Sequence, residues 1–351
     1  MKYETDDLRI ASIKAVTPPR EVCEEIPITD QAARTTWETR TAIHDVLAGQ
    51  DDRLMVVAGP CSIHDTVAAL DYGRKLLAAK RELERDLLIV MRVYFEKPRT
   101  TVGWKGLIND PDLDGSFHIN KGLRLARQLL RDLNEMGMPA GTEFLDIVTP
   151  QYVTDLVSWG AIGARTTESQ VHREVASGLS CPVGFKNGTD GTTQIAVDAI
   201  RAASVPHNFL SLRKEGNSAI FITRGNPDCH IILRGGKSPN YDAASIDRVA
   251  GELEHAGLPA KIMVDFSHAN SGKKHERQVD VAGDVTRQIA GGETRIFGVM
   301  LESHLVAGRQ DVVAGRKLVY GQSITDACLG WEQTEPLLRE LARAVAARRA
   351  L

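Results

Sequence analysis

Short apolar runs alternate with amphipathic helical patterns along most of the chain after residue 50. Most of these runs are rich in Val, Ile, Leu or Met, and such short apolar runs are typical of buried strands. Eight such runs occupy residues 53–61, 87–97, 139–144, 161–167, 182–187, 230–236, 261–268 and 295–304. Helical patterns between them cover residues 66–86, 121–137, 149–160, 168–179, 193–203 and 243–257.

This alternation predicts an α/β fold, a (β/α)8 (TIM) barrel built from residues 51–351. Residues 1–50 are expected to form an N-terminal arm, and a final helix is expected from Asp326 to about Arg349. A ninth run, residues 207–226, alternates on both sides of a Lys-Glu-Gly-Asn turn, which predicts a β-hairpin inserted before the sixth strand. Parts added to a plain barrel usually serve binding or assembly.

Composition narrows the class of protein. The 351 residues are 42% hydrophobic and 25% charged, as in an ordinary globular enzyme, and the net charge of −3 offers no global field for a nucleic acid. No apolar segment is long enough to span a membrane, and residues 1–10 lack the core of a signal peptide. Five scattered cysteines suit a reducing compartment. The expected location is the cytoplasm, with neither nucleic acid nor membrane as a partner.

In a barrel of this kind the chemistry lies at the carboxyl ends of the strands. Several of the predicted strands end in cations, which are too numerous for one carboxylate and suit a substrate that also carries phosphate. These cations are Arg92, Lys97, Arg165, Lys186 and Arg234. The sequence therefore predicts a local anion-binding site at the mouth of the barrel.

Three other strand ends, together with the start of the last helix, carry metal-ligand side chains: Cys61, His268, Glu302 and Asp326. This mixture of soft and hard donors suggests one divalent ion, with Mn²⁺ favoured and Fe²⁺, Co²⁺ or Zn²⁺ as alternatives. Cys61 could instead be a packed turn residue, and Glu302 could instead pair with a cation at the mouth. Other histidines are expected to support the site (His64, His172, His304) or the fold (His207, His230).

Eight ordered motifs carry a family resemblance over essentially the whole chain. They are GPCSIHD (59–65), RVYFEKPRTTVGWKG (92–106), GARTTESQ (163–170), PVGFKNGTDG (182–191), HIILRGG (230–236), DFSHAN (265–270), MLESH (300–304) and SITDACLGWE (323–332). Together they resemble 3-deoxy-D-arabino-heptulosonate-7-phosphate (DAHP) synthases of the short, feedback-regulated type I class. That family condenses phosphoenolpyruvate with erythrose 4-phosphate and water, giving DAHP and phosphate in the first step towards aromatic amino acids.

The resemblance assigns roles to residues at the matching positions. Phosphoenolpyruvate would be held by Arg92, Lys97, Gly163, Ala164, Arg165, Lys186 and Arg234. The aldose phosphate would be held by Arg99 and Thr100, and the metal by Cys61, His268, Glu302 and Asp326. Lys97, Cys61 and His268 are the predicted catalytic residues, with Lys97 donating a proton to the developing alkoxide. We expect the neighbouring cations to bring the pKa of Lys97 towards neutrality.

In the resembling family the arm and the hairpin meet across a subunit interface and hold an aromatic amino acid. The matching positions are Asp6, Asp7, Ile10, Pro150, Gln151, Val175, Leu179, Ser180, Phe209, Ser211 and Phe221. An apolar slot at Leu179, Phe209 and Phe221 suits a phenyl ring, although these residues could simply pack the hairpin and arm. Family members with Ser at the position of Ser211 resemble the phenylalanine-sensitive form, whereas Gly there tends to accompany tyrosine. Phenylalanine is therefore the predicted inhibitor and tyrosine the alternative. The family also favours a homo-oligomer, a dimer or a tetramer.

Three other functions remain open from the sequence. A sister synthase adds phosphoenolpyruvate to arabinose 5-phosphate, but its members as a rule lack the KPRT pattern and the hairpin. A Schiff-base aldolase would use Lys97 or Lys186 as its nucleophile. A sensor that binds an amino acid on an inactive barrel is the non-enzymatic alternative, and the complete sets of cations and ligands argue against it.

Overall fold

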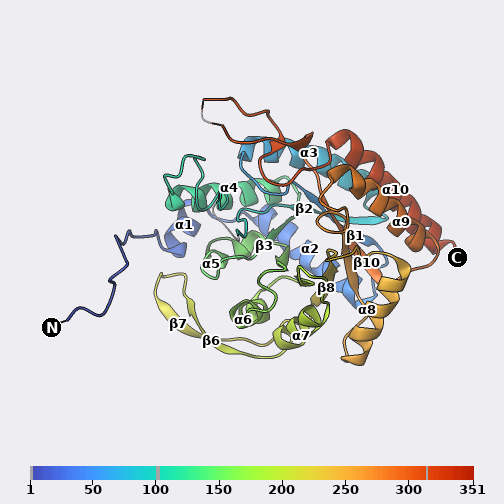
Figure 1. Cartoon of the computed structure of the whole chain (residues 1–351), viewed down its shortest axis with the longest axis horizontal. Coiled ribbons are helices and arrows are strands. Elements are labelled where there is room, and N and C mark those ends of the chain that lie inside the picture. Colours follow the sequence, from blue (N-terminus) through green and yellow to red (C-terminus); the bar gives the residue numbers. More distant parts are fainter. Residues whose placement is uncertain (1–2, 100–102, 314) are drawn as a thin grey trace.

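The computed structural model describes residues 3–99, 103–313 and 315–351, and Figure 1 shows a closed barrel surrounded by helices. Eight parallel strands form the barrel in the order β1-β10-β9-β8-β5-β4-β3-β2. Their bounds are β1 Leu54–Gly59, β2 Leu87–Arg92, β3 Ala140–Glu143, β4 Trp159–Ile162, β5 Val183–Lys186, β8 Cys229–Leu233, β9 Ile262–Asp265 and β10 Ile296–Glu302. The predicted (β/α)8 barrel is confirmed.

Helices lie between the strands along the chain and cover the outside of the barrel. They are α3 Thr66–Leu83, α4 Ile119–Glu135, α5 Pro150–Val153, α6 Gln170–Gly178, α7 Gln194–Ala203, α8 Ala243–His255, α9 Gln278–Ala290 and α10 Trp331–Arg349. Short 3-10 helices follow α5 at η1 Thr154–Leu156 and precede α9 at η2 His275–Arg277. None of the helices in the described ranges combines the length and the apolar character that a membrane crossing requires.

The alternation along each strand separates two cores. In β1, Leu54, Val56 and Ala58 face the surrounding helices. Met55 and Val57 point into the barrel, where they pack with residues of the other strands such as Trp159, Met263 and Phe297. Because the interior is filled by side chains, substrate chemistry is confined to the loops at the carboxyl ends.

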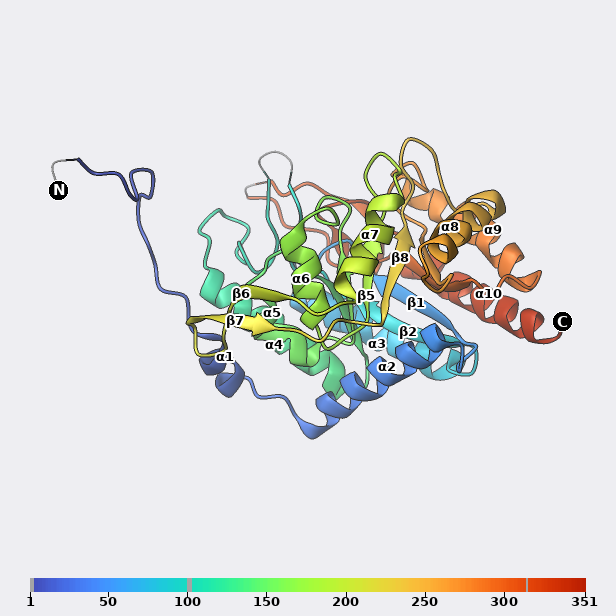
Figure 2. The same ribbon diagram turned by 90° about the horizontal axis from the view of Figure 1, so that it is seen from below.

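Two helices form inside the predicted arm, α1 Pro19–Glu25 and α2 Asp30–Ala48. Thr29 caps α2 by accepting a hydrogen bond from the backbone N–H of Ala32, and Gly49 ends it at a positive φ of 75°. Ile43 and Val46 of α2 join the interior cluster of the barrel. Figure 2 shows α2 crossing beneath the strands, so the helix closes the amino-terminal end of the barrel.

The predicted hairpin forms outside the barrel, from β6 Asn208–Leu212 and β7 Ser218–Ile222. The two strands are antiparallel, and Phe209 lies opposite Phe221 with ring centroids 6.1 Å apart. The tip of the hairpin contacts the first turn of α1, where the backbone N–H of Arg20 donates to the carbonyl of Lys214.

The last helix begins at Trp331 and not at Asp326 as predicted. Residues 326–330 are not helical, and Cys328 and Leu329 form isolated β-bridges with residues that follow β10. Leu329 donates its N–H to the carbonyl of Glu302 and accepts from the N–H of His304, while Cys328 pairs with Gly308. These long-range backbone bonds compete with helix formation, and they bring Asp326 to the mouth of the barrel on a loop.

His230 lies inside the barrel, between Trp159 and Phe297. The indole N–H of Trp159 donates to His230 Nε2 at 3.2 Å, so the hydrogen on Nδ1 faces the carbonyl of Asp228, also at 3.2 Å. Burial lowers the pKa of His230 to about 4. The imidazole is therefore neutral in the fold and contributes stability that depends on pH.

We expect this contribution to be complete above pH 6.5 and to be lost as the pH falls towards 4, because only the unfolded chain binds the proton in that window. The loss is about 3 kcal/mol at most. His230→Gln keeps a donor and an acceptor but cannot titrate. Urea unfolding of both proteins between pH 7 and 4 should show wild type losing stability relative to the variant, and parallel curves would contradict the prediction.

Candidate active site

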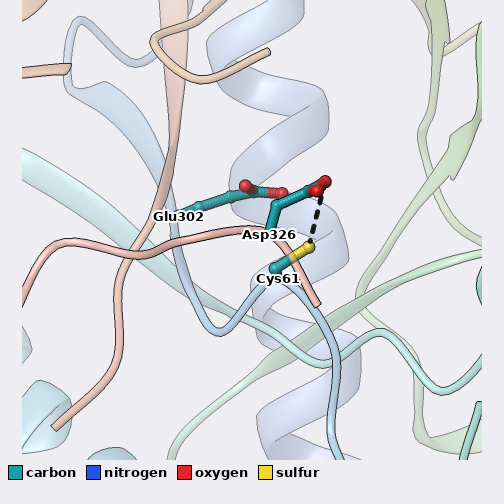
Figure 3. Close-up of side chains that lie close together, drawn as sticks. All are labelled: Cys61, Glu302 and Asp326. Atoms are coloured by element: carbon teal, nitrogen blue, oxygen red, sulfur yellow. Dashed lines mark hydrogen bonds between the residues drawn. The ribbon is translucent and has the colours of Figure 1, made fainter. Parts of the chain in front are cut away.

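The ligand atoms of Cys61, Glu302 and Asp326 all lie within 4.8 Å of one another (Figure 3). Cys61 follows β1 and Glu302 ends β10, and these two strands are neighbours, with Gly59 in register with Glu302. The fourth predicted ligand is close as well, because His268 Nε2 lies 4.0 Å from Glu302 Oε1. The structure thus brings three of the predicted metal ligands together and places the fourth, His268, beside one of them, Glu302.

His268 sits in an unusual backbone conformation on the loop after β9. Its φ is 56°, in the left-handed region that residues other than glycine adopt at a cost. Its ring Nδ1 lies 2.9 Å from a carboxylate oxygen of Asp265 and 2.7 Å from the hydroxyl of Ser267. The side chain is therefore held from one side, and Nε2 points towards Glu302.

The Cys61 thiol is fully buried beside a cation. Burial raises its pKa to about 11 and Glu302 adds to the rise, whereas Lys97 opposes it. The Lys97 ammonium lies 3.1 Å from the sulfur, and Asp326 Oδ2 lies 3.6 Å from it. A divalent ion at this position would favour the thiolate further, because a metal ligand must lose its proton.

The prediction that neighbouring cations would bring the pKa of Lys97 towards neutrality is wrong. Burial does lower the pKa of Lys97, but the acidic groups beside it, the ionising thiol of Cys61 and the carboxylate of Glu302, outweigh burial. The net effect is a pKa above the usual value for lysine, so the side chain is a firm ammonium in this arrangement. Sequence reasoning counted the nearby cations and could not weigh the anions against them.

Arg92, the last residue of β2, is buried and contacts the same cluster. Its guanidinium donates to Glu302 Oε1 at 3.0 Å and to the carbonyls of Pro60 and Cys61 at 3.1 and 3.2 Å. It also stacks over Tyr94, 3.6 Å from the ring centroid. Arg92 therefore orients a predicted metal ligand, and it borders the adjoining cavity as well.

A cavity of about 390 Å³ opens beside the metal-ligand cluster. Its walls carry an excess of cations over carboxylates, as the sequence predicts for an anion site. The predicted residues that line it are Arg92, Lys97, Arg99, Gly163, Ala164, Arg165, Lys186, Arg234, His268 and Asp326. Thr100, the remaining predicted substrate residue, lies outside the described residues.

The cations differ in how strongly the protein already engages them. Lys186 donates to Asp265 at 2.9 Å and is buried. Among the described residues, the side chain of Arg234 makes only a long contact of 3.4 Å, with the carbonyl of Gly235. Burial lowers the pKa of Arg234, although Asp265 opposes the change. Arg99 and Arg165 are exposed at the rim. Arg234, Arg99 and Arg165 can thus offer most of their donors to a ligand.

Three buried asparagines connect the loops that carry these side chains. Asn187 accepts hydrogen bonds from the N–H of Arg234 and the amide of Asn240, at 2.8 and 3.2 Å. Asn240 accepts from the N–H of Gly235 and donates its own N–H to Asn270, at 2.7 and 2.9 Å. This network links the ends of β5, β8 and β9, so the cations and the imidazole project from one rigid frame.

Several residues at the site escaped the sequence reasoning. Thr189 and Lys273 line the cavity, on the loops after β5 and β9. Asp265 lies beneath it and bonds both Lys186 and His268. Asp265 belongs to the DFSHAN motif, so the sequence analysis could have selected it. It is the last residue of a buried strand, however, and the sequence pattern alone does not show that its side chain contacts Lys186 and His268.

The predicted effector residues fall into two groups. Leu179 and Phe221 line a cavity of about 450 Å³ between the end of α6 and β7. Phe209 is the cross-strand partner of Phe221, and the ammonium of Lys214 at the hairpin tip donates to the carbonyl of Gln151 at 2.7 Å. The remaining predicted positions on these elements, Pro150, Val175, Ser180 and Ser211, lie on or beside α5, α6 and β6.

Asp6, Asp7 and Ile10 lie apart from that group. All three are exposed, on the extended segment that precedes α1. Figures 1 and 2 show this segment leaving the body near the hairpin tip and running outward. Within one chain the structure therefore does not bring these residues to the hairpin.

The fold and the site define a class: barrel enzymes whose strand ends bind an anionic substrate beside a set of metal-type ligands. The chain belongs to the DAHP synthetase I family, whose profile matches residues 25–339.

Similarity to individual proteins extends over the whole chain. It is 64% identical over 349 residues to the Escherichia coli K12 protein named phospho-2-dehydro-3-deoxyheptonate aldolase, Phe-sensitive, covering 99% of this chain and 100% of that one. The Haemophilus influenzae phospho-2-dehydro-3-deoxyheptonate aldolase is 58% identical over 345 residues, 98% of this chain and 95% of that one. A solved structure of the Francisella tularensis phospho-2-dehydro-3-deoxyheptonate aldolase has a TM-score of 0.95 at 52% identity, covering 97% of this chain and 100% of that one. The predicted function, DAHP synthase, is confirmed.

Proposed function

We propose that this DAHP synthase carries out its reaction in the cavity at the mouth of the barrel, with one divalent ion held by Cys61, His268, Glu302 and Asp326. The observation that carries the proposal is the position of three metal-type ligands, within 4.8 Å of one another, beside a cavity lined mainly by cations. Phosphoenolpyruvate and erythrose 4-phosphate are both anions, and such a cavity suits them.

The donor set fits a first-row divalent ion. One sulfur, one imidazole and two carboxylates are mixed soft and hard ligands, and we favour Mn²⁺, with Fe²⁺, Co²⁺ or Zn²⁺ as alternatives. When bound, such an ion would act as a Lewis acid towards an oxygen of the substrate or water. Arg92 keeps Glu302 in place through its 3.0 Å hydrogen bond, and Lys97 stabilises negative charge on the Cys61 sulfur.

We assign phosphoenolpyruvate to the inner part of the cavity. Arg234 and Lys186 are buried there and can bind phosphate or carboxylate oxygens, with Arg92 and Lys97 beside them and Arg165 closing the rim. Gly163 and Ala164 border the same cavity and offer backbone. Arg99, together with Thr100, is assigned to the phosphate of erythrose 4-phosphate at the outer edge.

In the proposed reaction carbon 3 of the enol attacks the aldehyde carbon, and the aldehyde oxygen becomes an alkoxide. Water adds to carbon 2 and loses a proton, and the bond between carbon 2 and the phosphate oxygen breaks to release phosphate. Lys97 is the proposed proton donor to that oxygen, since its buried ammonium lies among the predicted metal ligands.

Lys97 and Lys186, the two candidate nucleophiles of a Schiff-base aldolase, both argue against that alternative. Lys97 has a raised pKa and Lys186 is ion-paired with Asp265, so neither offers the neutral amine that imine formation needs.

We propose that phenylalanine inhibits the enzyme at the slot formed by the hairpin and α6. Phe209, Phe221 and Leu179 offer an apolar surface there, and the similar Escherichia coli protein is named Phe-sensitive. Asp6 and Asp7 would bind the ammonium of the amino acid from a second subunit, because the segment before α1 runs away from the hairpin of its own chain. The proposal thus includes a homo-oligomer, a dimer or tetramer, and we retain the cytoplasm as the predicted location.

One assay tests these assignments: phosphate release from phosphoenolpyruvate and erythrose 4-phosphate. We expect release to stop in the presence of EDTA and to return with excess Mn²⁺, because all four ligands are assigned to one ion. We expect L-phenylalanine to inhibit more strongly than L-tyrosine or L-tryptophan. The side chain of Ser211 leaves less room for the ring hydroxyl of tyrosine than a glycine at this position would. Arabinose 5-phosphate in place of erythrose 4-phosphate serves as the control for the aldose.

Two results would contradict the proposal. Full activity after prolonged chelation would show that the reaction does not require the assigned divalent ion. Inhibition by tyrosine but not by phenylalanine would overturn the choice of effector while leaving the active site untouched.

A further inference from the structure

Asp265, at the carboxyl end of β9, is fully buried and has every acceptor position in use. Its Oδ1 accepts hydrogen bonds from the backbone N–H and the hydroxyl of Ser267, at 3.0 and 2.6 Å. Its Oδ2 lies 2.9 Å from the ammonium of Lys186 and 2.9 Å from His268 Nδ1. One carboxylate oxygen thus touches a lysine of the substrate cavity and the imidazole of the metal-ligand cluster.

The contacts of Asp265 fix which nitrogen of His268 carries the hydrogen. A carboxylate can only accept, so Nδ1 must be the donor in the 2.9 Å contact. The Ser267 hydroxyl directs its own hydrogen to Asp265 Oδ1 and presents a lone pair to Nδ1 at 2.7 Å. Both neighbours of Nδ1 therefore accept, which leaves the lone pair of Nε2 facing Glu302.

The backbone alone does not provide this orientation. His268 adopts a φ of 56°, and the segment after β9 turns sharply at this residue. An imidazole on such a turn can rotate about its side-chain bonds unless other groups hold it. Asp265 and Ser267 are the groups that contact its Nδ1, and Lys186 holds the Asp265 carboxylate from the other side.

We infer that Asp265 is a positioning residue that locks the tautomer and the orientation of His268 so that Nε2 can bind the metal. The inference rests on the proposed assignment of His268 as a ligand, and it adds a role for a residue outside the predicted ligand and substrate sets. Carboxylates that accept from a ligating histidine raise its basicity and fix its ring, and their loss lowers metal affinity by about 10- to 100-fold.

The test is titration of Co²⁺ into chelator-treated protein, with binding followed by the visible absorption of the ion. We expect Asp265→Asn to weaken Co²⁺ binding by about 10- to 100-fold. The charge-transfer band from the Cys61 thiolate should persist, while the d–d bands should change because the nitrogen ligand is poorly held. Asp155→Asn is the matched control, because it breaks an ion pair with buried Arg127 on another part of the fold.

A double-mutant cycle separates positioning from general damage. If Asp265 acts through His268, the double variant Asp265→Asn/His268→Ala should bind Co²⁺ no more weakly than His268→Ala alone. Additive losses would overturn the inference, and so would unchanged affinity or unchanged d–d bands in Asp265→Asn. If wild type itself bound no Co²⁺, the metal assignment under the proposed function would fail first.

Ser267→Ala keeps the test available should Asp265→Asn fail to fold. It removes the hydroxyl that contacts both Asp265 and His268 Nδ1 but leaves the carboxylate and its ion pair in place. We expect a loss of Co²⁺ affinity of a few-fold that also disappears in the His268→Ala background. A Ser267→Ala protein with wild-type affinity would count against the inference in the same way.

Discussion

Replacing Lys97 with alanine is expected to lower kcat by at least about 10²-fold at saturating Mn²⁺, the usual scale for losing a general acid. The buried ammonium lies 3.1 Å from the Cys61 sulfur and borders the cavity, so it can reach an oxygen that gains charge beside the metal ligands. Phosphate release under saturating substrates measures kcat directly.

Two further variants control that experiment. Lys105→Ala removes an exposed lysine from the same loop, and we expect near-normal turnover. Lys97→Met keeps most of the buried side-chain volume without the charge, and it should be as slow as Lys97→Ala. If the Lys97→Ala enzyme retained more than a tenth of wild-type kcat, Lys97 would not be the proton donor.

Cys61→Ala is expected to lower Mn²⁺ affinity by at least about 10²-fold, because losing a direct ligand costs no less than losing a group that orients one. Activity at limiting Mn²⁺ should fall with the affinity. Equilibrium titration of Mn²⁺ into the chelator-treated protein, followed by electron paramagnetic resonance, gives the dissociation constant without reference to activity.

Cys181→Ala is a closely matched control. Both thiols are buried, and burial raises the pKa of each to about 11. Cys61 has Lys97 and Asp326 as neighbours of its sulfur, whereas Cys181 packs in the core beside Gly160. The two variants should lose similar stability, about 1 kcal/mol, and only Cys61→Ala should lose the metal. Equal Mn²⁺ affinities would mean that Cys61 is a packed turn residue.

Much of the fold followed from local patterns. Alternating apolar positions in β1 separate Met55 and Val57 inside the barrel from Leu54 and Val56 outside, and each of the eight runs supplied one strand. Element bounds were less well predicted where long-range bonds intervene. The segment between β3 and β4 forms α5 and η1. The last helix starts at Trp331 because Leu329 bonds to Glu302 and His304, and Cys328 bonds to Gly308.

The composition of the site was also predictable, since parallel strands place their carboxyl ends on one side of a barrel. That rule is enough to gather Cys61, His268 and Glu302 from the positions where their strands end. It does not say how far each side chain lies from the others. The direction of the pKa change at Lys97 depended on those distances, because anions and cations act on the ammonium in opposite senses.

The sequence by itself determined the barrel, the hairpin, the set of cations and donors at the strand ends, and the family. These features follow from the order and spacing of residue types, which the chain carries locally. Only the tertiary structure decided that Asp326 arrives on a loop, that Asp265 bonds both Lys186 and His268, and that the segment before α1 runs away from the hairpin of its own chain. Contacts between residues far apart in the chain are set by packing, and no local pattern encodes their distances.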